Sequence, residues 1–172
     1  APAAHGGDRT GRVFTGDRSG DWLYEALHHF GFANQATSTH VGDGLALTDC
    51  YIGATVRCAP PANKPTPKEF IACRPFVVRE VQLLKAVRVV VVLGKIAFDH
   101  YLKAGRELGH RLPTPLPKFG HGAIYNLPWD VTLISSYHPS QQNTFTGKLT
   151  RSMFHRIFSH ARQTLSGTSN QN

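Results

Sequence analysis

The sequence predicts a layered α/β fold with a mainly parallel sheet. Segments with strand composition alternate with segments of helical periodicity along most of the chain. The valine-rich segment 88–93 is typical of a parallel strand that is covered on both faces. A length of 172 residues, 41% of them hydrophobic, suits one domain with a buried core. We expect this domain over residues 1–165 and a disordered tail over 166–172.

The first third of the chain contains a loop, a helix and a short strand in our prediction. Five glycines and several small polar residues within 1–20 predict a loop that approaches a ligand closely. Apolar spacing predicts a helix over 21–30, which Gly31 ends. β-branched residues predict a strand over 51–56, although its glycine weakens the prediction.

A capping box predicts the next helix. Thr66 at the N-cap, Pro67 at the first helical position and Glu69 three residues after the cap indicate a helix over 67–86, kinked near Pro75. The elements that follow the valine-rich strand are, in order, a helix over 95–104, proline-rich loop or edge structure over 113–128, a strand over 131–137 and a helix from Thr150 to about 165.

Charge and cysteine usage favour an intracellular protein with a polyanionic partner. The formal net charge is +8 and the estimated pI is 9.8. No apolar segment is long enough to span a membrane, so we expect a soluble protein. Three cysteines form an odd set, which argues against a disulfide framework. The chain opens at Ala1 with a loop and no preceding strand, so we expect a truncated N-terminus.

The strongest local signal follows the predicted strand 131–137. His138 is followed by a proline-stiffened turn and by short polar side chains that can bind phosphates or base edges. A single histidine at a strand end is more often a hydrogen-bonded structural residue. An unrelated hydrolase would need a nucleophile or metal set beside His138, and the sequence has no G-x-S-x-G, HExxH or P-loop pattern.

Several segments together resemble the motifs of B-type (family 5) uracil-DNA glycosylases. APAAHGGDRTGRVFTGD at 1–17 resembles the first motif of that family, and HPSQQNTFTG at 138–147 resembles the last. Residues 56–67, CRPF at 73–76 and the strand and turn at 89–95 resemble segments between them. The resemblance implies a three-layer α/β/α sandwich that flips a deaminated base out of double-stranded DNA and hydrolyses its N-glycosidic bond.

The resemblance also implies roles for residues of the first and last motifs. His138 would hydrogen-bond the departing base where negative charge develops. Asp8 would orient water or stabilise the sugar cation, unless it is a plain turn residue. Phe14 would stack on the flipped base, or else it is a core side chain under the loop. Ala1 stands where related families carry an aspartate, so that base is absent here.

A wider set of residues is expected to contact DNA. Polar and basic side chains of the matching motifs are assigned this role: His5, Arg9, Lys64, Ser140, Gln141, Gln142, Asn143 and Thr144. Further basic residues are candidate phosphate contacts, although a charged loop residue is usually just solvated: Arg12, Arg57, Lys148 and Arg151.

The base pocket is expected to accept more than uracil. In related families an asparagine reads the edge of uracil, whereas Ala54 and Thr55 occupy that region here. A pocket without this amide leaves fewer unsatisfied polar groups on other bases. We therefore expect hypoxanthine and other lesions to be accepted as well.

Two cysteines match part of an iron–sulfur site. Cys58 and Cys73 resemble two of four ligands of the family's 4Fe-4S cluster, and the other two belong upstream of the first motif. Two thiolates cannot hold such a cluster. Either the full protein has a longer N-terminus, or this version lacks the metal and these are ordinary buried cysteines.

The sequence leaves three hypotheses open. The first is a monofunctional, monomeric base-excision glycosylase in the bacterial cytosol or nucleoid. The second is a truncated DNA-binding domain that has lost catalysis, and the third is an unrelated hydrolase that uses His138. The length and order of the matching motifs favour the first.

Overall fold

The computed structural model describes residues 4–61 and 64–167, and it contains two compact units. The first unit comprises Ala1–Pro75 and Pro139–Lys148, and the second comprises Phe76–His138 and Leu149–Asn172. The single domain predicted over 1–165 stays a prediction.

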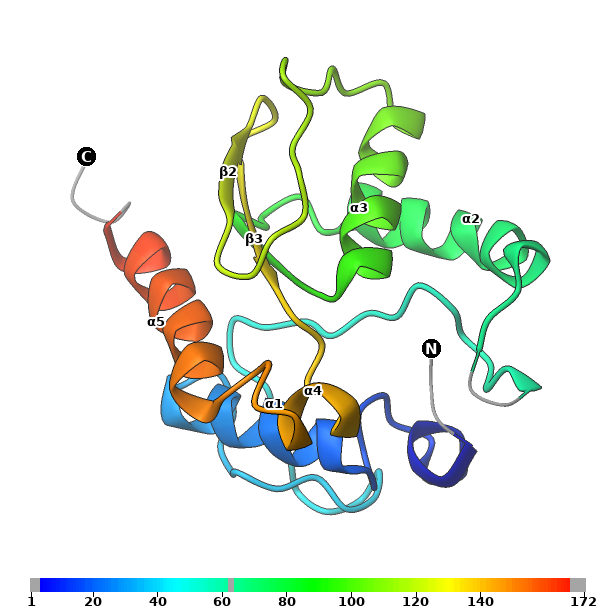
Figure 1. Cartoon of the computed structure of the whole chain (residues 1–172), viewed down its shortest axis with the longest axis vertical. Coiled ribbons are helices and arrows are strands. Elements are labelled where there is room, and N and C mark those ends of the chain that lie inside the picture. Colours follow the sequence, from blue (N-terminus) through cyan, green and yellow to red (C-terminus); the bar gives the residue numbers. More distant parts are fainter. Residues whose placement is uncertain (1–3, 62–63, 168–172) are drawn as a thin grey trace. The chain divides into compact units, whose positions relative to one another are not determined.

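The second unit is built on a three-stranded sheet with the strand order β1-β3-β2. β1 (Val89–Leu93) and β3 (Val131–Ser136) are parallel, whereas β2 (Ile124–Leu127) pairs with β3 in the antiparallel direction (Figure 1). The strands predicted over 88–93 and 131–137 are therefore confirmed. β2 lies at the sheet edge inside the segment predicted as loop or edge structure.

Two helices cover the two faces of this sheet. α3 (Lys95–Glu107) packs on the face that carries Val92 and Leu133, with Phe98 in the same apolar cluster. Because side chains alternate along a strand, Ile134 points to the opposite face. α5 (Arg151–Gly167) lies beside the sheet and contacts β3 and β1 there (Figure 1). It buries four apolar side chains. These layers confirm the predicted α/β class.

The most deeply covered strand is β3 rather than the valine-rich β1. Five of the six β3 residues are buried, but in β1 Val92 alone is, and its other residues are half-buried. The prediction that β1 is covered on both faces agrees with the contacts that α3 and α5 both make with it, but this cover leaves most of its residues half-buried. β3 has a neighbour on each side, whereas β1 is an edge strand of the described sheet, so solvent reaches its side chains.

Side-chain caps determine where three helices begin. α1 (Arg18–His29) begins three residues before the predicted helix, because Asp17 Oδ1 accepts the N–H of Gly20 at 2.9 Å. α2 (Pro67–Leu83) begins with the predicted capping box, in which the Thr66 N–H donates to Glu69 Oε2 at 2.6 Å. At α5 the Met153 N–H donates to Thr150 Oγ1 at 3.3 Å, so the predicted start is confirmed.

Two further predictions differ from the structure. Residues 51–56 are irregular, so the strand predicted there was wrong. A strand needs a hydrogen-bonded neighbour, and the bridge between Ala33 and Leu47 is the one β-bridge of the described first unit. At the other end, α5 continues through Gly167, past the predicted start of the tail at Ser166. Residues 168–172 of that tail lie outside the described residues.

Among the described residues, no helix is both long and apolar enough to cross a membrane.

We predict that the two isoleucines of one cross-strand pair contribute unequally to stability. Ile134 is fully buried, and its partner Ile124 is 45% exposed. Ile134→Ala should lower the free energy of unfolding by about 2–5 kcal/mol, because it leaves a cavity under α5. Ile124→Ala is the matched control and should cost less than about 1 kcal/mol. Urea unfolding measures both values, and equal losses would contradict the assigned layers.

Candidate functional site

His138 lies two residues beyond the carboxyl end of β3, where parallel strands of α/β sheets usually present their functional groups. Its side chain is half-buried. The Gly94 N–H at the end of β1 donates to the Ser136 carbonyl at 2.8 Å. Gly94 has φ +92°, and a Cβ there would lie 3.3 Å from the His138 Cβ. A glycine therefore lets the β1 end approach His138 closely.

A second histidine, His121, lies against the residues that precede His138. Its Nδ1 accepts the backbone N–H of Tyr137 at 3.2 Å, and its ring stacks on the Tyr137 ring with centroids 5.1 Å apart. Burial lowers the pKa of His121 below its usual value, although a backbone hydrogen bond with Met153 opposes this shift. From the sequence, this residue lies in the segment 113–128 that was predicted as loop or edge structure, with no predicted role. The Gly-His-Gly sequence around it was the one local pattern that could have singled it out as a candidate site residue.

The polar residues after His138 form a short helix in the first unit. Ser140 is the N-cap of α4 (Gln141–Phe145), and its Oγ accepts the N–H of Asn143 at 3.4 Å. Gln141 and Gln142 are exposed, whereas Asn143 and Thr144 are half-buried. Ser140 thus has a capping role that the sequence analysis did not assign. A contact of these residues with DNA stays a prediction.

An exposed aromatic ring at the end of α4 was missed by the sequence analysis. Phe145 is 67% exposed, and the guanidinium carbon of Arg18 lies 4.4 Å from its ring centroid. This cation–π distance joins α4 to the first turn of α1, which directly follows the first motif. The first unit therefore brings the ends of the two motifs together.

The first loop is held in a conformation that depends on glycine. Its opening turn, η1 (Ala4–Asp8), leaves Asp8 and Arg9 exposed. Phe14 is half-buried and has φ +58°, an unusual value for a residue other than glycine. A Cβ at Gly20 would lie 1.8 Å from the Phe14 carbonyl oxygen. The absence of a side chain at position 20 therefore allows this conformation of Phe14.

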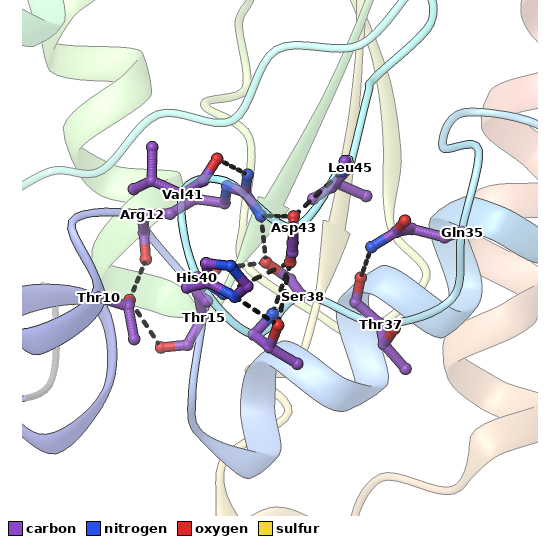
Figure 2. Close-up of polar contacts among 12 residues, drawn as sticks. Thr10, Arg12, Thr15, Gln35, Thr37, Ser38, His40, Val41, Asp43 and Leu45 are labelled. Carbon is purple, nitrogen blue, oxygen red and sulfur yellow. Dashed lines mark hydrogen bonds and ion pairs between the residues drawn. The ribbon is translucent and has the colours of Figure 1, made fainter.

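A partly buried polar network connects the same loop to the segment 38–45 (Figure 2). Arg12 donates to Ser38 Oγ at 2.8 Å, to Asp43 Oδ1 at 2.9 Å and to the Val41 carbonyl at 2.9 Å. Thr15, which is fully buried, shares a hydrogen bond of 2.6 Å with Ser38. These contacts give Arg12 a structural role, whereas the sequence offered it as a candidate phosphate contact or a solvated charge.

The Asp43 carboxylate is stabilised in its charged form. The backbone N–H of Thr39 donates to it at 2.7 Å, and this bond, with the Arg12 guanidinium and further backbone N–H groups, holds the pKa of Asp43 well below its usual range. The carboxylate therefore stays ionised at every pH at which the protein would be assayed, and its hydrogen bonds to the loop are retained.

Residues 50–52 and the first loop line the same hollow. Its volume is about 350 Å³, and Arg12, Val13, Tyr51 and Ile52 are among its lining residues. Ala54 and Thr55 follow directly and are half-buried in irregular backbone. The segment predicted to form the base pocket thus lies near the first motif, although not as a strand.

The segments that carry the two predicted cluster ligands, Cys58 and Cys73, approach each other, because the backbone N–H of Arg57 donates to the Cys73 sulfur. Lys64 and Cys58 are exposed, and Cys73 is half-buried with its sulfur 3.5 Å from the Arg57 nitrogen. Within residues 4–61 and 64–167, no three His, Cys, Asp or Glu side chains gather as a metal site. Ala1 and the side chain of His5 lie outside the described residues.

Known proteins resemble the chain along almost its whole length. Residues 1–162 match the Uracil DNA glycosylase superfamily. The chain is 48% identical over 164 residues to the Type-5 uracil-DNA glycosylase of Mycobacterium bovis, which covers 95% of the chain and 60% of that protein. It is 47% identical over 165 residues to the Type-5 uracil-DNA glycosylase of Thermus thermophilus, which covers 95% of the chain and 72% of that protein. A Type-4 uracil-DNA glycosylase of Thermotoga maritima is 33% identical over 96 residues, 55% of the chain and 42% of that protein.

We predict that Gly20→Ala disturbs the first loop. The new Cβ would overlap the Phe14 carbonyl oxygen, so either α1 or the loop must shift. The variant should lose about 1–3 kcal/mol in free energy of unfolding. Gly42→Ala is the control, because the nearest atom to its new Cβ would be 3.8 Å away. An unchanged stability of Gly20→Ala would contradict the described packing.

Proposed function

The chain belongs to the uracil DNA glycosylase superfamily, and from this membership we propose that it is a monofunctional DNA-repair glycosylase. It would flip a deaminated base out of double-stranded DNA and hydrolyse the N-glycosidic bond, leaving an abasic site. The Type-5 names of the similar proteins support this activity. The chain spans 60% of the length of the Mycobacterium bovis relative, so the activity of the whole protein is part of the proposal.

The observation that carries the proposal is the position of His138. It is half-buried at the carboxyl end of the central strand, within the segment that matches the superfamily. An imidazole N–H here would donate to the base oxygen that becomes negative as the C1′–N bond breaks. The electrons of that bond leave with the base, so a donor at this oxygen stabilises the transition state.

The attacking water would be oriented from the first loop. Water forms the new bond to C1′ and loses a proton, which an exposed carboxylate such as Asp8 can accept or pass to solvent. Asp8 would also stabilise the positive charge that develops on the sugar. Phe14, held by the loop network, would stack on the flipped base.

The base pocket would have broad selectivity. Ala54 and Thr55 offer no side-chain amide that could pair with the edge of uracil. Hypoxanthine and other lesions would therefore be released along with uracil.

The DNA would be held by basic and polar groups of both motifs. Exposed Arg9, Lys64, Gln141 and Gln142 are suited to phosphates or to the gap left by the flipped base. The net charge of +8 supports a strong, salt-dependent attraction to DNA. We place the protein in the bacterial cytosol or nucleoid as a monomer.

The described residues do not suit a 4Fe-4S cluster by themselves. Cys58 and Cys73 would supply two thiolates, and a cluster of this type needs four ligands. Among the described residues, no three metal-ligating side chains gather to supply the remaining ligands. A cluster in the full-length protein remains part of the proposal.

We predict that His138→Ala abolishes most of the base release. A labelled duplex with one uracil, treated with alkali after the reaction, reports each abasic site as a strand break. The variant should reduce the single-turnover rate by about 100–1000-fold, the range for removal of one oxyanion donor. His160→Ala, which changes an exposed histidine of α5, is the control and should retain the wild-type rate.

The two proposed classes of protein give different results in this assay. Absence of strand breaks with the wild-type protein, together with salt-sensitive DNA binding, would indicate an inactive DNA-binding domain instead. The similarity to proteins named as glycosylases does not favour that alternative.

A second prediction concerns the range of bases. The same duplex with hypoxanthine in place of uracil should also yield strand breaks, and their rate should depend equally on His138. Release of uracil alone would show that other groups than Ala54 and Thr55 determine selectivity.

A further inference from the structure

The residues on each side of His121, Gly120 and Gly122, are hydrogen-bonded to the carboxyl end of β3. The Gly122 N–H donates to the Ser135 carbonyl at 2.7 Å, and the Ser135 hydroxyl donates to the Gly120 carbonyl at 2.5 Å. The imidazole between these glycines is therefore fixed relative to the strand. It accepts the Tyr137 N–H, and its Nδ1 lies 3.4 Å from the Ser136 hydroxyl. Tyr137, the residue directly before His138, is thus hydrogen-bonded to this ring.

The hydrogen bond with Tyr137 requires one protonation state. A backbone N–H can only donate, so Nδ1 of His121 must be unprotonated. The proton of the neutral ring is then on Nε2, which matches the hydrogen bond with the backbone of Met153 in α5. The proton of His121 therefore determines whether Tyr137 keeps its bond.

We propose that His121 is a positioning residue of the proposed glycosylase: its neutral imidazole holds the Tyr137 amide, and thereby places the adjacent His138 for contact with the departing base. This inference rests on the proposed function. His121 itself has no contact with substrate in this role. Its contribution passes through one backbone hydrogen bond and one ring stack.

The arrangement makes the position of His138 sensitive to acid. Among the described residues, Tyr137 stacks on the ring of His121 and Arg156 from α5 faces it. Burial and the Arg156 charge lower the pKa of His121, so the ring is neutral at pH 7. As the pH falls through that lowered pKa, Nδ1 gains a proton and can no longer accept the Tyr137 N–H. The rate should fall with it.

We predict that two replacements of His121 distinguish the contribution of its hydrogen bond to the rate from the contribution of its ring stack. His121→Asn retains an acceptor near the Nδ1 position but cannot be protonated in this range, whereas His121→Phe retains a stacking ring without an acceptor. Single-turnover uracil release at pH 7.5 should fall about tenfold in the Phe variant and stay within about threefold in the Asn variant. Duplex affinity should be unchanged in both.

The pH profile distinguishes positioning from simple stability. Between pH 5 and pH 8, the wild-type rate should show an acidic decline that is reduced in His121→Asn. His110→Asn is a matched control, because His110 is also half-buried and stacked, 4.6 Å from the Trp129 ring. It should leave the rate and its pH profile unchanged. A wild-type rate in His121→Phe, or an unaltered acidic decline in His121→Asn, would overturn the inference.

A spectroscopic measurement keeps this inference separate from the proposed function. In ¹⁵N spectra of the wild-type protein, the Tyr137 amide and the His138 ring should shift together as His121 is titrated, and they should not do so in His121→Asn. Lack of this shared shift would overturn the positioning role even in an active enzyme. A protein that shows the shift but releases no uracil would instead overturn the proposed function.

Discussion

The parallel pairing of β1 and β3 is the constraint on which the candidate site depends. It brings two strand ends, distant in sequence, to the same edge of the sheet, and the bond from the Gly94 N–H to Ser136 closes that edge. β3 is buried between two neighbours and two helices, so its end has little freedom. A histidine placed directly after such a strand is positioned by the core itself. Such a placement would supply the preorganisation that the proposed stabilisation of charge by His138 requires.

The first unit holds its loop by other means. There the anchor is polar: a guanidinium and a carboxylate, both partly shielded, bind each other and the backbone of a neighbouring segment (Figure 2). Such a pair is costly to desolvate, and it is tolerated where several hydrogen bonds share the charge, as they do around Asp43. Because hydrogen bonds are directional, they define one conformation for the glycine-rich backbone. Apolar contacts alone are not directional and would not do so. A loop with five glycines needs this, because its entropy in the unfolded chain is high.

Much of the fold could be predicted from sequence wherever local pattern and final environment agree. The helical spacing of α5 and the capping box at Thr66 are of this kind. The prediction of a strand over 51–56 was wrong because residue preferences do not show whether a partner strand is present. The structural role of Arg12 could not be predicted for a similar reason, because the sequence does not show that its guanidinium lies 2.9 Å from the Asp43 carboxylate. The proposed role of His121 depends on tertiary contacts, which the loop sequence around it does not show.

The path of the chain between the two units has a consequence for any fragment of this protein. The chain passes from the first unit to the second after Pro75, returns at Pro139 and leaves again after Lys148. A cut after Pro75 would therefore leave ten residues of the first unit, including α4, on the piece that carries the sheet. The two pieces would have to associate to complete the first unit. In a protein split at this point, a complete first unit would therefore show that the pieces had associated. Expression of residues 1–75 alone would yield a unit without the ring that Arg18 covers.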